Sequence, residues 1–105
     1  MTDERLADEL VRRALGWRPA PDRYVKPGRS WIPRSKFRPL ADVRDAFRLL
    51  DAVTADYALV TTPGGTFTAQ VRLAGRTGQA AGEPKARTIC LALAQALGLE
   101  AEANG

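Results

Sequence analysis

The sequence predicts a small α+β domain, a layered sandwich in which helices pack against an antiparallel sheet. Apolar residues recur at helical spacing in three segments, and they alternate with polar residues in a segment between the second and the third. A chain of 105 residues can build a single core and is too short for two. The expected order is therefore helix, two short strands, helix, three strands, helix.

The first helix is expected over residues 2–15. Thr2 suits its N-cap, and Gly16 suits its end because glycine readily takes the left-handed conformation found there. We expect Trp17 to fold back onto the apolar face of this helix. That face consists of Leu6, Leu10, Val11 and Ala14.

Residues 18–39 contain five prolines, which exclude a helix and limit any strand to a short or edge piece. The segments "RYV" (23–25) and "SWI" (30–32) are the two that can pair. We predict a short hairpin between them that turns at "KPGR" (26–29), where Pro-Gly supplies the turn geometry.

A second helix is expected over residues 39–51, with Pro39 in its first turn. Its apolar face is predicted to consist of Leu40, Val43, Phe47 and Leu50. The charged residues on the same helix are interpreted as surface ion pairs at three- and four-residue spacing. They are Asp42, Asp45, Arg44 and Arg48.

Strands are expected over residues 57–62, 66–73 and 79–82, with turns at 63–65 and 74–78. The middle strand alternates, which places helices on one side of the sheet only. Its apolar side is formed by Phe67, Ala69, Val71 and Leu73, and its polar side by Thr66, Thr68, Gln70 and Arg72. The polar side either joins two copies sheet to sheet or lies under the N-terminal helix.

The last helix is expected over residues 83–98, opened by Pro84 and closed by Gly98. We expect it to pack through Ala86, Ile89, Cys90, Leu93 and Leu97. Residues 100–105 are predicted to form a frayed tail, so that the domain spans residues 1–99.

The composition argues against enzymatic activity, a metal centre and a cofactor. The chain has no histidine, one cysteine and two serines, Ser30 and Ser35, neither of which lies in a nucleophile motif. No phosphate-binding glycine loop and no paired cysteine motif are present. No apolar run is long enough to span a membrane, and the acidic start "MTDERLADEL" is unlike a signal peptide, so a cytoplasmic protein is expected. Cys90 is interpreted as a buried apolar residue.

Positive charge is concentrated in one segment. Between Trp17 and Arg38 there are seven basic residues and one acid, Asp22, whereas acids slightly outnumber bases in the rest of the chain. This asymmetry predicts a contact surface for an anionic partner. The candidate residues are Arg18, Arg23, Lys26, Arg29, Arg34, Lys36 and Arg38, with Lys85, Arg87 and Arg76 as helpers if the fold brings them near.

Two kinds of partner fit this surface. Arg, Trp and Tyr are typical of protein interfaces, which favours a non-enzymatic binding or adaptor module. Arginines among aromatic residues also suit phosphate and base stacking, so a nucleic-acid-binding accessory protein is the alternative. A solvated charged face with no partner is the third interpretation. Trp17 and Trp31 are expected to be core residues rather than binding groups.

Four motifs in order resemble the phage ABA sandwich family: "ALGW" (14–17), "SWIP" (30–33), "FTAQVRL" (67–73) and "ARTICLALAQAL" (86–97). The positions that carry this resemblance are Gly16, Trp17, Trp31, Pro33, Ile89, Cys90, Ala92 and Leu93. The resemblance implies an α/β sandwich of phage or prophage origin and no known activity.

Residues 40–98 are also similar in element order to the double-stranded-RNA-binding domain. That family binds phosphates through lysines at the start of its last helix and reaches the minor groove with a histidine. Here the last helix starts "EPKARTIC", and the loop "TPGGT" (62–66) has no histidine. The resemblance therefore concerns the fold and not the function.

Overall fold

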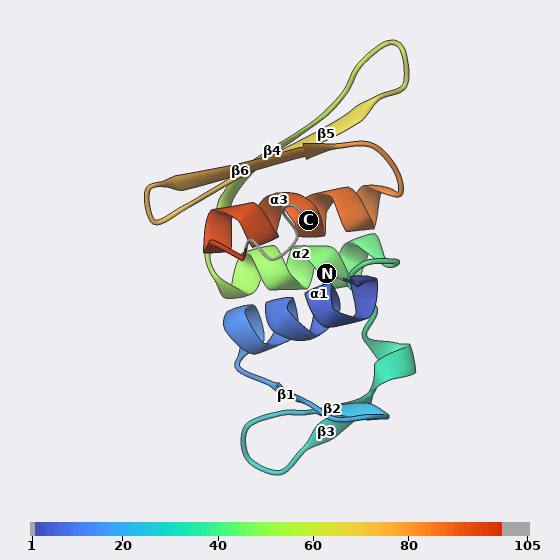
Figure 1. Cartoon of the computed structure of the whole chain (residues 1–105), viewed down its shortest axis with the longest axis vertical. Coiled ribbons are helices and arrows are strands. Elements are labelled where there is room, and N and C mark those ends of the chain that lie inside the picture. The colour runs from blue at the N-terminus through green and yellow to red at the C-terminus, as the bar shows by residue number, and fades with distance from the viewer. Residues whose placement is uncertain (1, 100–105) are drawn as a thin grey trace.

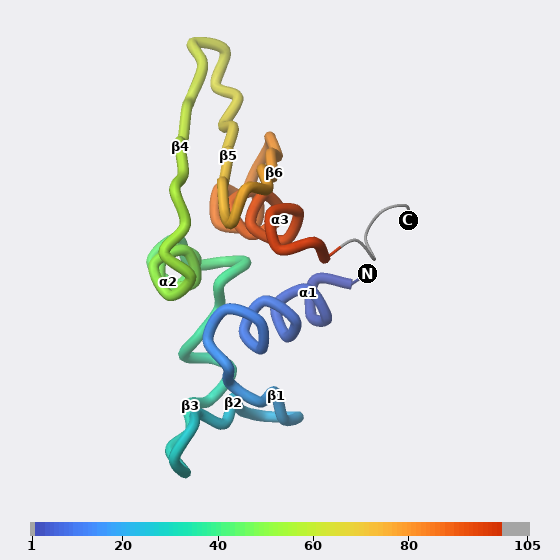
Figure 2. Tube along the Cα trace, turned by 90° about the vertical axis from the view of Figure 1, so that its left-hand side faces the viewer, coloured from blue at the N-terminus to red at the C-terminus, as the bar shows by residue number. Residues whose placement is uncertain are grey.

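The computed structural model describes residues 2–99 and places three α-helices between two three-stranded antiparallel sheets (Figure 1). The large sheet lies at one end and the small sheet at the other; α3 packs on the large sheet, α1 lies toward the small sheet, and α2 lies beside both helices (Figures 1 and 2). The helices are α1 (Asp3–Leu10), α2 (Val43–Ala52) and α3 (Lys85–Leu97), with a π-helical turn (Val11–Leu15) after α1 and a 3-10 turn (Arg34–Lys36) before α2. The small sheet consists of β1 (Arg18–Pro19), β2 (Arg23–Val25) and β3 (Trp31–Pro33), and the large sheet of β4 (Asp56–Thr61), β5 (Phe67–Leu73) and β6 (Arg76–Ala81). The predicted α+β class and element order are confirmed.

Both ends of the first helical segment form where the sequence predicts. Thr2 Oγ1 accepts a hydrogen bond of 3.1 Å from the backbone N–H of Arg5, which caps α1. The helical run continues through the π-helical turn to Gly16, whose φ of 72° ends it. Trp17 then lies buried against α1, as expected.

The second helix starts later than predicted. Asp42 is its N-cap and accepts a hydrogen bond of 2.9 Å from the backbone N–H of Arg44. An aspartate cap competes with proline at the first turn, and here the cap sets the start. Pro39 instead lies buried before the helix, where its carbonyl accepts a hydrogen bond from the Cys90 thiol at 3.3 Å.

The small sheet has one strand more than expected. The predicted hairpin is present, with Tyr24 opposite Ile32, and Lys26 N–H donates to the Ser30 carbonyl across its turn. β1 joins it as a third strand through pairing of Arg18 with Val25. Sequence alternation cannot reveal a two-residue strand.

The large sheet has α3 on one side only, as predicted. Phe67, Ala69 and Val71 are buried against α3, whereas Gln70 and Arg72 point to solvent. α1 lies on the far side of α2 and α3, so it leaves the polar side of β5 open (Figures 1 and 2). The sheet-to-sheet dimer stays a prediction.

The third strand begins three residues earlier than expected. Ala74 and Gly75 alone form the turn, with φ values of 52° and 82°. Positive φ at both central positions is typical of the two-residue hairpin turn whose twist matches that of the strands it joins. β6 therefore includes Gly78, which packs closely against α3.

Candidate interaction surface

The register of the small sheet separates its residues into two faces. Residues paired across antiparallel strands share a face, and so do residues two apart along one strand. Pro19, Tyr24 and Ile32 face α1, and Tyr24 is only 2% exposed. The solvent side, named here the basic-aromatic face, consists of Arg18, Arg23, Val25, Trp31 and Pro33.

Trp31 lies on the edge strand β3, opposite Val25, and is 51% exposed. The guanidinium carbon of Arg23 sits 4.1 Å from the centroid of its ring, in cation–π contact. Arg23 is held there by Asp22, whose carboxylate accepts hydrogen bonds of 3.0 and 2.9 Å. These bonds also lower the pKa of Asp22. Trp31 was expected in the core, and that prediction is wrong. The register pairs Trp31 with Val25, which places it on the opposite face of the sheet from the buried Tyr24.

The aromatic core between the small sheet and the helices is formed by Trp17, Tyr24 and Phe37. The ring centroids of Trp17 and Phe37 are 5.1 Å apart, and the rings of Tyr24 and Phe37 meet edge to face at 6.1 Å. Lys26 Nζ lies 5.1 Å from the Trp17 ring, and the Arg48 guanidinium carbon lies 5.2 Å from the Phe37 ring. Lys26 is therefore half-buried against the core.

Arg34 is partly buried and makes all its contacts within the domain. It donates to both carboxylate oxygens of Asp8 in α1, at 2.8 and 3.2 Å, and to the Ala20 carbonyl at 2.7 Å. It also donates to the Tyr24 hydroxyl at 3.3 Å, and its guanidinium carbon lies 4.7 Å from that ring. The bond to Asp8 raises the pKa of Arg34. This predicted contact residue links α1 to the small sheet.

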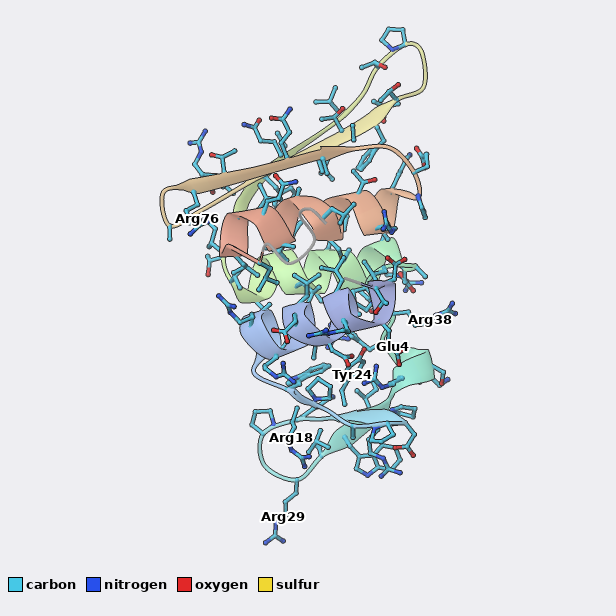
Figure 3. The ribbon with its side chains drawn as sticks, viewed as in Figure 1. Glu4, Arg18, Tyr24, Arg29, Arg38 and Arg76 are labelled. Carbon is cyan, nitrogen blue, oxygen red and sulfur yellow. The ribbon has the colours of Figure 1, made fainter. Side chains whose placement is uncertain are left out.

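The other candidate bases are divided between two places. Figure 3 shows Arg29 extending from the β2–β3 turn, at the same end of the molecule as Arg18. Arg38 lies beside Glu4 of α1, away from both (Figure 3). Lys36 is exposed on the 3-10 turn. The basic segment therefore forms two groups rather than one continuous surface.

The three helper residues do not join the basic-aromatic face. Arg87 donates to Asp3 at 3.0 to 3.1 Å and fastens α3 to the start of α1. Lys85 Nζ lies 5.6 Å from the Phe67 ring at the large sheet. Arg76 lies at the other end of the molecule, at the β5–β6 turn (Figure 3).

The charged residues of α2 make other contacts than the predicted ion pairs. Asp42 caps the helix, and Asp45 accepts a hydrogen bond of 2.9 Å from the backbone N–H of Arg38. Arg48 lies over the aromatic core. Within residues 2–99 no ion pair joins these side chains to one another, so that prediction is wrong.

A hollow of about 320 Å³ lies between α1 and the segment before α2. Its walls carry charges of both signs, Glu4 and Arg38 among them, above the Phe37 ring. Of its four charged side chains, Asp3 and Arg34 already form ion pairs within the protein. The hollow therefore has no net preference for an anion or a cation.

Reactive groups are scarce in the part of the chain that is described. Burial raises the pKa of the Cys90 thiol to about 12, which keeps it protonated and unreactive at neutral pH. Residues 2–99 bring no three potential metal ligands together. Each helix in the same range is too short or too polar to span a membrane.

The fold defines a class of small α+β domains in which helices lie between two three-stranded antiparallel sheets. The chain is similar in structure to a phage protein from Bacillus cereus ATCC 14579, with a TM-score of 0.70 and 14% identity over 91% of this chain and 92% of that one. At this identity the likeness shows a shared fold. No family model and no curated protein matches the sequence, so membership of the phage ABA sandwich family stays a prediction.

Proposed function

We propose that the chain is a non-enzymatic binding module of phage type whose protein partner contacts the basic-aromatic face. The observation that carries the proposal is the exposure of Trp31, which stacks with Arg23 and lies in one row with Val25 and Arg18 across the small sheet. Tryptophan and arginine are the residues most often found at the energetic centre of protein interfaces. The phage character rests on the fold shared with the Bacillus cereus protein and on the sequence motifs.

The arrangement of side chains supports a protein partner over a nucleic acid. Trp31, Val25 and Pro33 supply an apolar centre, and Arg18 and Arg23 lie at its sides. An apolar centre with a polar rim is the usual anatomy of a protein interface. Phosphate binding by the whole basic segment would require its charges on one surface, and they are divided. The partner we expect carries acidic side chains around an apolar or aromatic group.

Site-specific photo-crosslinking tests this proposal. A photoreactive amino acid at Pro33 should link the chain to one protein from the cells in which it is expressed. The Trp31→Ala and Arg23→Ala variants should lose that product. A matched probe at Gln70, exposed on the large sheet, is the control. The same products from both positions, or no effect of Trp31→Ala, would refute the proposed surface.

A single-stranded nucleic acid is the second candidate, favoured by the Arg23–Trp31 stack, because bases stack on exposed aromatic rings. Three arginines near Trp31 would neutralise about three phosphates. Binding would then weaken roughly twentyfold between about 50 and 200 mM salt. Fluorescence anisotropy with a labelled oligonucleotide measures this. Such a salt dependence, lost in Trp31→Ala, would replace the protein partner by nucleic acid.

A further inference from the structure

β4 is exposed along its whole length, although it forms part of the large sheet. It is one edge of that sheet, with β5 in the centre and β6 at the other edge. Five of its six residues are exposed, including Tyr57 at 44% and Val60 at 54%. Figure 2 shows β4 on the side of the sheet away from β6, with α2 at its lower end. No other strand of residues 2–99 pairs with its outer edge.

The hydrogen bonds of the hairpin show which backbone groups this edge offers. Thr62 N–H donates to the Thr66 carbonyl at 2.9 Å, so Thr62 and its alternate neighbours in β4 bond toward β5. Gly82 N–H donates to the Phe67 carbonyl, and Phe67, which is paired with Thr61, therefore bonds toward β6. The N–H and C=O groups of Tyr57, Leu59 and Thr61 consequently point to the open edge.

The other sheet edges carry features that discourage strand pairing. β1 has two residues and β3 has three, and each includes a proline, Pro19 and Pro33. β6 begins with an arginine and contains a glycine. Short length, proline and charge are the usual protections of an edge. β4 has six residues, no proline, and a charge only at its first position, Asp56.

We propose that β4 pairs antiparallel with β4 of a second copy of this chain, about a two-fold axis at Leu59. The outward-pointing N–H and C=O groups of Tyr57, Leu59 and Thr61 are spaced symmetrically about Leu59. A second β4 strand rotated by 180° about an axis at Leu59 therefore presents matching donors and acceptors. Tyr57 then pairs with Thr61 of the second copy, and Leu59 pairs with its counterpart. The two large sheets become one continuous sheet.

The side chains at this seam fit a second copy as well. Ala58 lies opposite Val60 of the second copy on the solvent side, which covers the most exposed large apolar residue of the strand. Asp56 lies opposite Thr62 of the second copy, so no like charges meet, although each chain carries a net charge of +4. The seam lies on the large sheet, and the basic-aromatic face on the small sheet stays free (Figure 1).

Sedimentation velocity and amide hydrogen exchange test the pairing together. The wild-type chain should sediment as a dimer as its concentration rises toward the millimolar range. When about nine-tenths of the chains are dimeric, exchange at Tyr57, Leu59 and Thr61 should slow about tenfold, since only the monomer exposes these amides. Ala58 and Val60 bond toward β5 in both states and are the internal controls. A chain that remains monomeric, or a dimer in which the three amides exchange unchanged, overturns the proposal.

A charge-swap pair separates loss of pairing from loss of folding. The double variant Ala58→Lys, Val60→Lys places lysines opposite lysines across the seam, and Ala58→Glu, Val60→Glu does the same with acids. Both positions are exposed, so the monomer tolerates either sign. Each variant alone should be monomeric, and an equimolar mixture should form a heterodimer. A mixture that remains monomeric while wild type dimerises refutes the β4 seam. The outcome is independent of the Trp31 experiments.

Discussion

Replacement of Gly78 by alanine should destabilise the protein through one contact between β6 and α3. Gly78 lies on the side of β6 that faces the helix, where it pairs with Val71. A Cβ atom there would overlap the Ala92 carbonyl oxygen and lie 2.7 Å from the Ala96 nitrogen and 2.9 Å from the Ala92 carbonyl carbon. These are backbone atoms, so they can move away only if α3 shifts as a unit.

The magnitude follows from two opposing effects. The backbone of Gly78 does not have a positive φ, so alanine fits its conformation and would gain about 0.4 to 1 kcal/mol through the unfolded chain. Overpacking a rigid site costs about 1 to 3 kcal/mol and at times more. Because the whole helix must move, we expect a net loss of about 2 to 3 kcal/mol. This corresponds to a fall in Tm of roughly 10 to 20 °C for a domain of this size.

Urea and thermal unfolding followed by circular dichroism measure this loss. Gly64→Ala is the matched control, because a Cβ at Gly64 meets nothing within 4 Å and its φ is not in the left-handed region. We expect its free energy of unfolding within about 0.5 kcal/mol of wild type. If Gly78→Ala unfolds at the same urea concentration as Gly64→Ala, the close approach of β6 to α3 is wrong.

Three further predictions concern contacts within the domain. Arg34→Ala should lower the free energy of unfolding by about 2 kcal/mol, since the partly buried Asp8 loses its partner. A double-mutant cycle with Asp8→Asn should give a coupling energy of about 1 kcal/mol or more, and additive effects of the two substitutions would contradict this. Asp42→Ala should cost about 1 kcal/mol in urea unfolding, because the N-cap of α2 is lost. The folded Cys90 has a pKa of about 12, above the roughly 8.5 of an unfolded thiol, so stability should be unaffected below about pH 8 and fall as the pH rises toward 12. Cys90→Ala should show a shallower fall in stability over that range, and an equal slope would exclude Cys90 as a cause.

Several features could be predicted because their signals lie close together in the chain. The α1 helix is marked by Thr2 and Gly16, and both caps form as predicted. The alternation in β5 and the packing face of α3 around Cys90 are also local patterns. Both faces are buried as expected except at their last residues, Leu73 and Leu97, which are partly buried. In each case one element presents a face whose period needs no knowledge of its neighbours.

Other features depend on a choice between two local signals or on contacts between residues that are distant in the chain. Pro39 and Asp42 both suit a helix start; the structure uses Asp42 as the N-cap, while Pro39 lies buried beside Cys90. Arg34 is indistinguishable in sequence from the exposed Arg29. Its role appears only when Asp8, distant in the chain, lies across from it.

By itself, the sequence determined the class of fold, the order of its elements, the burial of Cys90 and the concentration of positive charge in one segment. Those properties follow from residue type and local period. Only the tertiary structure decided that Trp31 faces solvent, that the basic segment divides into two groups and that β4 keeps an open edge. These depend on strand register and on packing between distant segments, where a shift of one residue in register exchanges the buried and exposed faces of a strand.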